Sequence, residues 1–209
     1  IDELVFLDIT ATNEKRKTLA DLAKKIAGVI NIPFTVGGGV ASTEDVRVLL
    51  QNGADKIAVN SAAFKNPELV AALAKEFGSQ CIVVAIDTKQ EADGVWYVYL
   101  NGGTVATKTT CLAWAQEAAK LGAGEILLTS MNHDGTKAGF ALDITRAVSK
   151  AVSIPVIASG GGGTMAHFED VFTTGAADAA LAASIFHFKE IEVYALKSFL
   201  FDKGLPIRL

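Results

Sequence analysis

Short apolar runs rich in β-branched residues alternate along this chain with longer segments in which apolar residues recur every three or four positions. Runs of the first kind are typical of strands buried on both faces of a sheet, and segments of the second kind are typical of amphipathic helices. The pattern predicts strands at residues 3–8, 33–37, 56–60, 81–87, 125–130, 155–159 and 179–183. It predicts helices at residues 20–29, 43–51, 67–77, 112–121, 143–152, 165–174 and 191–203. This alternation favours an α/β fold built on a parallel sheet.

Local signals refine the pattern at three places. Ser42 precedes the second predicted helix and is a residue type that caps helices. Asn66 is a similar candidate before Pro67, because proline suits the first helical position. The segment at residues 94–106 interrupts the alternation, since an aromatic and β-branched run is followed there by the turn sequence at residues 101–103. We expect a β-hairpin inserted after the fourth strand.

Most of the chain occurs twice, at an offset of about 122 residues. A repeat of this length suits half of a large α/β domain better than a solenoid module. The alternative, that βα units resemble one another only in composition, requires the order and the spacing of the matches to be coincidental. The matching segments are residues 3–8 with 125–130, residues 32–39 with 154–161, and residues 54–55 with 177–178.

The strand at residues 81–87 has no repeat partner, because its counterpart would lie about forty positions before Ile1. Two halves in the same order and one unit short of symmetry favour a (β/α)8 TIM barrel over an open doubly wound sheet. We therefore expect residues 1–209 to form a single barrel domain. It would hold units two to eight of eight and lack the N-terminal first βα unit.

Composition limits the possible functions. A formal net charge of −4 argues against a large nucleic-acid surface. No apolar run is long enough for a membrane span and no signal peptide opens the chain, so we expect a cytoplasmic protein. Cys81 and Cys111 fit neither a disulfide framework nor a metal motif. The three histidines lie far apart without ligand spacing, so we expect no metal.

Two glycine-rich loops follow strands that are repeat mates, at residues 37–39 and 160–163. The next strand of each half ends on a serine, in Asn60-Ser61 and Ala183-Ser184. Glycine lets backbone N–H groups approach a phosphate closely, and the hydroxyl adds a further donor. Two such cups at one barrel mouth predict a ligand with a phosphate at each end. The alternative is that these glycines serve only tight turns and packing.

Asp8 and Asp87 end predicted strands, and Asp134 lies in the loop after the fifth predicted strand. A carboxylate at a barrel mouth can act as a general acid or base, although an aspartate there can also form a turn or cap a helix. Asp87 ends an unbroken apolar run without a turn partner, so we expect its side chain to point into the mouth. Thr129 and Ser130 end the neighbouring strand and could hydrogen-bond substrate.

Six segments along the whole chain carry a resemblance to a known family: residues 2–11, 34–39, 84–87, 122–130, 158–161 and 182–187. They resemble the cyclase subunit of imidazole glycerol phosphate synthase. The resemblance implies a (β/α)8 barrel with a twofold internal repeat, active in histidine biosynthesis and without a cofactor. It also implies that the cyclase uses ammonia, delivered by a glutaminase partner, to convert the bisphosphate PRFAR into imidazole glycerol phosphate and AICAR.

The resemblance also assigns roles. Asp87 corresponds to one of two catalytic aspartates, and the other belongs to the first strand of the family. One phosphate site corresponds to Gly39, Asn60 and Ser61. The other phosphate site corresponds to Gly135, Gly161, Ala183 and Ser184, and the groove between the sites corresponds to Thr129 and Asp134. The gate for ammonia at the amino ends of the strands corresponds to Glu3, Lys56 and Glu125, although charges that begin buried strands are often merely solvated.

Two alternatives remain. The sister bisphosphate sugar isomerase of the same pathway shares the barrel and the paired aspartates, but residues 8–12 with Lys15-Arg16 and Asn60-Ser61 fit the cyclase better. The chain could also be a non-catalytic fragment that folds, since a missing unit removes a catalytic acid. A missing strand would expose two apolar edges, so we expect self-association across the gap or closure by distortion.

Overall fold

The computed structural model of this chain describes residues 1–8 and 13–209, and side chains at residues 1–8 and 19–209. The predictions that rest on residues 9–12 and on the side chains of Lys15, Arg16 and Lys17 lie outside the described residues.

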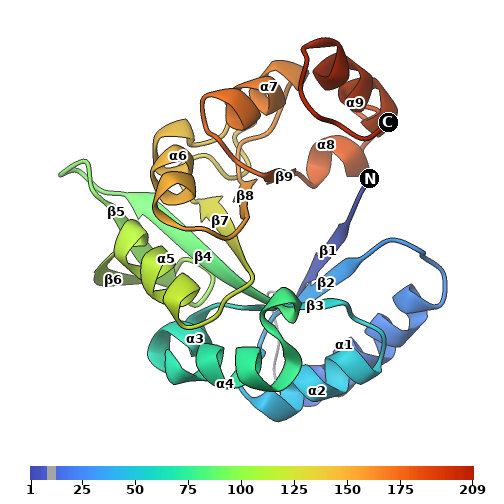
Figure 1. The fold of residues 1–209 in the computed structure, drawn as a ribbon, viewed down its shortest axis with the longest axis vertical. Helices are drawn as coiled ribbons and strands as arrows, with labels where there is room; N and C mark the ends of the chain where they lie inside the picture. The colour runs from blue at the N-terminus through green and yellow to red at the C-terminus, as the bar shows by residue number, and fades with distance from the viewer. Residues whose placement is uncertain (9–12) are drawn as a thin grey trace.

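Seven parallel strands form one curled sheet in the order β1-β2-β3-β4-β7-β8-β9, which confirms the α/β class and all seven predicted strands (Figure 1). Each neighbouring pair along this path is parallel. The strands are β1 (Leu4–Leu7), β2 (Phe34–Gly37), β3 (Lys56–Val59), β4 (Ile82–Gln90), β7 (Glu125–Ser130), β8 (Val156–Ser159) and β9 (Ala179–Leu181).

Helices cover the outer face of the sheet, and at least one helix lies between each strand of the path and the next or follows the last (Figure 1). Those that correspond to predicted helices are α1 (Asn13–Ala27), α2 (Thr43–Gln51), α4 (Glu68–Phe77), α5 (Cys111–Lys120), α6 (Leu142–Ala151), α7 (Met165–Thr173) and α9 (Val193–Asp202). Three shorter elements had no periodic signal because they are too short to show one. They are α3 (Ser61–Lys65), the 3-10 helix η1 (Ser79–Cys81) and α8 (Ser184–His187).

Helix boundaries differ from the prediction at two places. Helix α1 begins at Asn13 rather than at residue 20, because the polar stretch that opens it carries no apolar period. Asn66 is not a side-chain cap: Pro67 occupies the cap position of α4 and no side-chain cap hydrogen bond forms there. The prediction for Ser42 is confirmed, since its hydroxyl accepts a hydrogen bond from the Asp45 N–H at 3.2 Å.

Both faces of the sheet are buried, and this explains why the sequence of β4 is continuously apolar. Ile82, Val84 and Ile86 face the helices and belong to the large outer core. Val83 and Ala85 point the other way and pack with residues of neighbouring strands on the inner side of the curl. Side chains alternate along a strand, so a strand buried on both faces is apolar at every position.

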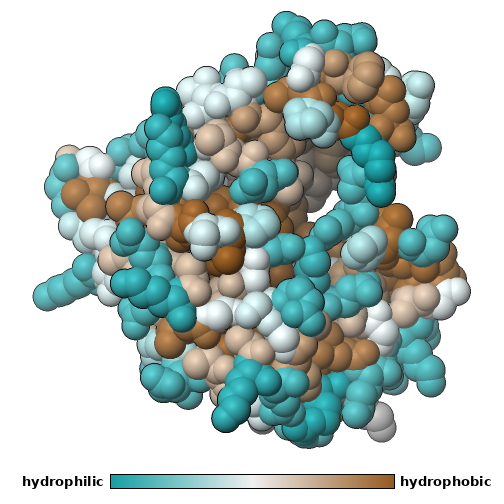
Figure 2. All heavy atoms as spheres, in the orientation of Figure 1, coloured by the Kyte–Doolittle hydropathy of each residue, from teal (hydrophilic) through white to brown (hydrophobic). Residues whose placement is uncertain are grey.

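The sheet curls like part of a barrel but has an open side in the described chain. β1 pairs with β2 and β9 pairs with β8, and among the described strands these two end strands do not pair with each other. Figure 1 shows β1 apart from β9, and Figure 2 shows an opening through the molecule on that side. The N-terminus lies beside α8 in Figure 1, and Asp2 Oδ1 bridges this side through ion pairs with Lys197 Nζ of α9 at 3.0 Å and Arg208 Nη2 at 3.2 Å. The structure thus has the form of an unclosed parallel barrel.

The predicted hairpin insertion is confirmed, with wider bounds. β5 (Trp96–Leu100) and β6 (Val105–Thr110) extend the sheet beyond the barrel layer. The last residues of β4, from Asp87 to Gln90, pair antiparallel with β5. β4 therefore continues past residue 87, where the apolar run ends and the hairpin pairing takes over.

In the part of the chain that the structure describes, none of the helices has the length and apolar character required to cross a membrane. The cytoplasmic location stays a prediction.

Candidate active site

The carboxyl end of β4 holds the carboxylate singled out from the sequence. Asp87 is half-buried there, and Asn60, which directly follows the neighbouring strand β3, points its amide at it. Asn60 Nδ2 donates a hydrogen bond to Asp87 Oδ2 at 3.0 Å. The amide thus fixes one carboxylate oxygen, and the expectation that Asn60 and Asp87 lie at one mouth is met by direct contact.

Burial raises the pKa of Asp87 above its ordinary value of 3.8, because it penalises the charged form. The hydrogen bond from Asn60 works against this, and the negative charge of Asp134 adds to it. The net pKa is raised. Asp87 therefore keeps its proton to a higher pH than an ordinary aspartate, which suits a group that donates and accepts protons in a reaction.

Thr129 and Asp134 come from β7 and the turn that follows it. Thr129 is in register with Asp87 on one side and with Ser159 of β8 on the other, so these residues form a row across adjacent strands. The Asp134 N–H donates to the Ser130 carbonyl at 2.9 Å, which closes the turn. The second glycine loop packs on this turn, since a Cβ at Gly160 would lie 3.3 Å from Asp134 Cα.

The first glycine loop follows β2, next to the end of β1. Gly38 and Gly39 have φ values of 112° and 65°, which favour glycine. A Cβ at Gly38 would overlap the Asp8 backbone, and the Asp8 N–H donates to the Gly37 carbonyl at 2.8 Å. Ser61 begins α3 one strand further along. The structure thus brings Gly39, Asn60 and Ser61 to the ends of neighbouring strands.

The second glycine loop follows β8 and lies against the segment after β7. Gly161 has a φ of 101°, and a Cβ there would overlap the Gly139 carbonyl. The Gly139 N–H donates a hydrogen bond to the Gly161 carbonyl oxygen at 2.8 Å. Packing therefore requires glycine at this position. Gly135 has a φ of 74° with open space around it, and Ala183 and Ser184 are exposed at the start of α8.

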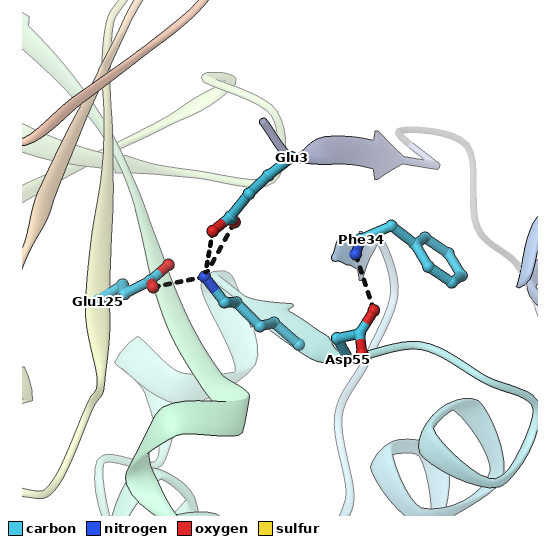
Figure 3. A network of polar contacts seen from close by, with 5 residues as sticks. Glu3, Phe34, Asp55 and Glu125 are labelled. Carbon is cyan, nitrogen blue, oxygen red and sulfur yellow. Dashed lines mark hydrogen bonds and ion pairs between the residues drawn. The ribbon is translucent and has the colours of Figure 1, made fainter. Parts of the chain in front are cut away.

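The charged residues at the amino ends of the strands form an ion-pair cluster (Figure 3). Lys56 Nζ lies 2.9 Å from Glu3 Oε2 and 2.6 Å from Glu125 Oε1. Burial alone would lower the pKa of Lys56, but the hydrogen bonds and charges of the two glutamates outweigh it and raise that pKa. The alternative of merely solvated charges is therefore wrong for Lys56 and Glu125, whose side chains are only 15% and 17% exposed.

Two aspartates that the sequence analysis noted only as repeat matches have equivalent structural roles. Asp55 Oδ2 accepts the Phe34 N–H at 2.9 Å (Figure 3), and Asp178 Oδ2 accepts the Val156 N–H at 2.9 Å. Each carboxylate ties the loop before one strand to the first residue of the preceding strand. The recurrence of the Ala-Asp pair was the available signal for this contact.

Sequence reasoning also missed the contacts of the hairpin with the site. The Asn101 N–H at the β5–β6 turn donates to Ser61 Oγ at 2.9 Å. Trp96 Nε1 donates to Asp143 Oδ2 at 2.9 Å, and its ring stacks on His133. These residues are far apart in the sequence, and only their spatial arrangement reveals the connection.

This arrangement defines a class of protein. Parallel strands wrapped by helices, with glycine loops and a half-buried carboxylate at the strand carboxyl ends, are typical of barrel enzymes whose chemistry lies in the strand-end loops. A family profile described as "Histidine biosynthesis protein" matches residues 1–192 of the chain.

Individual relatives narrow the assignment. The chain is 62% identical over 207 residues to imidazole glycerol phosphate synthase subunit HisF of Cytophaga hutchinsonii, covering 99% of this chain and 82% of the relative. It is 60% identical over 208 residues to the HisF subunit of Flavobacterium johnsoniae, covering 100% of this chain and 82% of that relative. The HisF subunit of a Hydrogenobaculum species is 54% identical over 208 residues. The chain belongs to the HisF family of histidine biosynthesis, which confirms the predicted family and its class, a cyclase with lyase activity.

Proposed function

We propose that this site converts PRFAR and ammonia into imidazole glycerol phosphate and AICAR. The observation that carries the proposal is the half-buried Asp87, with a raised pKa, between two glycine-and-serine loops at the same end of the sheet. Ring closure and cleavage of PRFAR require proton transfers. A carboxyl group whose pKa is raised can supply and recover a proton during them.

We assign Asp87 the role of general acid and base. Asn60 holds Asp87 Oδ2 through its amide, which leaves the other carboxylate oxygen to face the substrate. Thr129 and Asp134 line the groove between the two ends of the substrate, and the register of Thr129 with Asp87 supports this assignment.

We assign the two phosphates to two anion cups. The first cup consists of Gly39, Asn60 and Ser61, and the second consists of Gly135, Gly161, Ala183 and Ser184. Their places at the ends of β2 with β3 and of β8 with β9 support two separate anion sites. We expect Gly161 to contribute its backbone to the second cup. The space that a side chain at this position would need is occupied by the Gly139 carbonyl.

We further propose that ammonia enters at the amino ends of the strands, where a glutaminase partner docks and Glu3, Lys56 and Glu125 act as a gate. The ion pairs of Lys56 with both glutamates support a closed gate that opens by exchange of partners. Beyond it, the inner side of the curl is lined by small and aliphatic side chains, among them Ala58, Val83 and Ala85. A neutral ammonia molecule can pass such a lining with less cost than ammonium.

We propose that residues 1–209 belong to one barrel domain. The single curled path of parallel strands from β1 to β9 supports this proposal, and in the described chain these two end strands do not pair with each other. The chain covers 82% of the length of its HisF relatives.

A turnover assay distinguishes the proposal from its alternatives. The chain is incubated with ammonium and PRFAR, or with the substrate of the sister isomerase, and products are identified by chromatography. We expect AICAR and imidazole glycerol phosphate from PRFAR alone. Isomerised product would favour the isomerase. Binding of PRFAR without any turnover would favour a folded fragment that does no chemistry.

A further inference from the structure

The hairpin of β5 and β6 contacts the first anion cup through one hydrogen bond. At its tip, the Asn101 N–H donates a hydrogen bond of 2.9 Å to Ser61 Oγ, across 40 residues of sequence. Asn101 Oδ1 also lies 3.5 Å from Lys65 Nζ, at the other end of α3. The tip is therefore attached to the short helix that Ser61 begins.

This bond determines what the Ser61 hydroxyl can do. A serine hydroxyl has one hydrogen to donate and two lone pairs that accept. Because a lone pair of Ser61 Oγ is taken by the Asn101 N–H, the hydroxyl hydrogen is directed elsewhere. At the end of β3, this hydrogen is available as a donor for an anion in the first cup.

The backbone of the tip is suited to hold this N–H in place. Asn101 has a φ of 54°, a left-handed conformation that asparagine tolerates and β-branched residues do not. Two glycines with positive φ complete the turn. A Cβ at Gly103 would lie 2.5 Å from Met131 Cε, so the turn also rests on the loop that follows β7.

The base of the hairpin is attached to that same loop. The Gln90 N–H donates to Asn132 Oδ1 at 2.8 Å, and the Trp96 ring stacks on His133 at a centroid distance of 6.5 Å. The loop continues directly into Asp134 and Gly135. The hairpin thus has two contacts. It contacts the first cup at Ser61, and it contacts the loop after β7, which contributes residues to the second cup and to the groove.

We propose that Asn101 is a positioning residue for the bisphosphate substrate: its backbone N–H orients the Ser61 hydroxyl toward one phosphate, and the hairpin that carries it fixes this cup relative to the loop after β7. The proposal rests on the proposed function, because it takes Ser61 as a phosphate ligand. Asn101 itself touches no reacting atom.

The test measures the affinity for PRFAR without ammonia, so that no turnover occurs, by isothermal titration calorimetry. Asn101→Val forces a β-branched residue into a positive φ and should displace the N–H. Asn101→Gly is the matched control, since it also loses the contact with Lys65 but keeps the N–H and the backbone conformation. We expect the valine variant to weaken binding about three- to tenfold, the range for one net hydrogen bond, and the glycine variant to bind like the unmodified chain.

A double-mutant cycle with Ser61→Ala separates positioning from general structural damage. If the N–H acts through the hydroxyl, Asn101→Val weakens binding no further once the hydroxyl is gone. Effects of the two changes that simply add would overturn the proposal. If the valine variant does not fold, replacing the residue 101 amide by an ester, through the α-hydroxy analogue of asparagine, removes the N–H alone and must give the same result.

The cycle also distinguishes this proposal from the one on which it rests. Weaker binding by Ser61→Ala together with unchanged binding by both the valine and the ester variants would overturn the role of Asn101 and leave the cup assignment standing. Unchanged binding by Ser61→Ala would contradict the cup assignment and the role of Asn101 with it.

Discussion

At the scale of single residues, the site depends on how Asp87 is held. Its side chain is half-buried, one oxygen accepts the Asn60 amide, and the charge of Asp134 is close enough to raise its pKa further. Each of these features follows from strand ends that lie side by side. Because they raise its pKa, Asp87 keeps its proton to a higher pH than an ordinary aspartate, and its ionised form costs stability.

Replacing Asp87 by asparagine should therefore stabilise the fold in a pH-dependent way. The folded-state pKa of Asp87 is raised above its ordinary value of 3.8, so its contribution to stability is fully present below that value and is lost as the pH rises through the folded pKa. We expect the difference in Tm between Asp87→Asn and the unmodified chain to be more positive at pH 7 than at pH 3.5. Asp202→Asn at an exposed helix end controls for removing an aspartate. A difference independent of pH would contradict the raised pKa.

The second anion cup can be tested at Ser184, which is exposed. Gly161 is a poor place for such a test, because any side chain there would collide with Gly139. Ser184→Glu puts a negative charge in the cup, whereas Ser184→Gln adds the same bulk without charge. We expect the glutamate variant to bind PRFAR at least about tenfold more weakly than the glutamine variant, from the repulsion of like charges. Equal calorimetric affinities of the two would argue against a phosphate at this position.

At the scale of elements, hydrogen bonds from backbone N–H groups to Asp55 and Asp178 connect equivalent strands in the two halves of the chain. Asp55 and Asp178 each accept a backbone N–H at the start of a strand, and the Phe34 side chain beside one of them is 1% exposed. Asp55→Ala leaves that N–H without an acceptor and should lower the free energy of unfolding by about 1–3 kcal/mol in urea titration. Asp55→Asn keeps an acceptor and should cost less. Equal losses from both variants would mean that the charge, not the hydrogen bond, matters.

The alternation of apolar runs with amphipathic segments was sufficient to locate every strand of the parallel path, because a strand buried on both faces is apolar at nearly every position. The glycine loops and Asp87 were recognised because they follow such runs directly. The contacts of Asn101 with Ser61 and of Trp96 with Asp143 were not, since they join residues far apart through the inserted hairpin. The polar first turns of α1 gave no apolar period, and Asn66 was misjudged as a cap because a single suitable residue type does not determine cap geometry.

At the scale of the whole molecule, the curled sheet leaves β1 and β9 with one paired neighbour each in the described chain. Such edges present unpaired backbone groups to other strands. Leu7 of β1 is 42% exposed, which adds apolar surface at the open side. We expect the 209-residue chain to self-associate at micromolar concentration in sedimentation velocity, and to bind a dye for exposed apolar surface. A monodisperse monomer without dye binding would mean that the open side closes in solution.

The central claim is that Asp87 carries the proton transfers of an ammonia-dependent cyclase. The most direct test is the rate of AICAR formation from PRFAR and ammonium by the chain and by Asp87→Asn, with PRFAR affinity measured for both. We predict measurable turnover by the unmodified chain, a loss of about 10²-fold or more in the asparagine variant, and little change in affinity. Equal rates for the two proteins, with substrate bound equally well, would contradict the account.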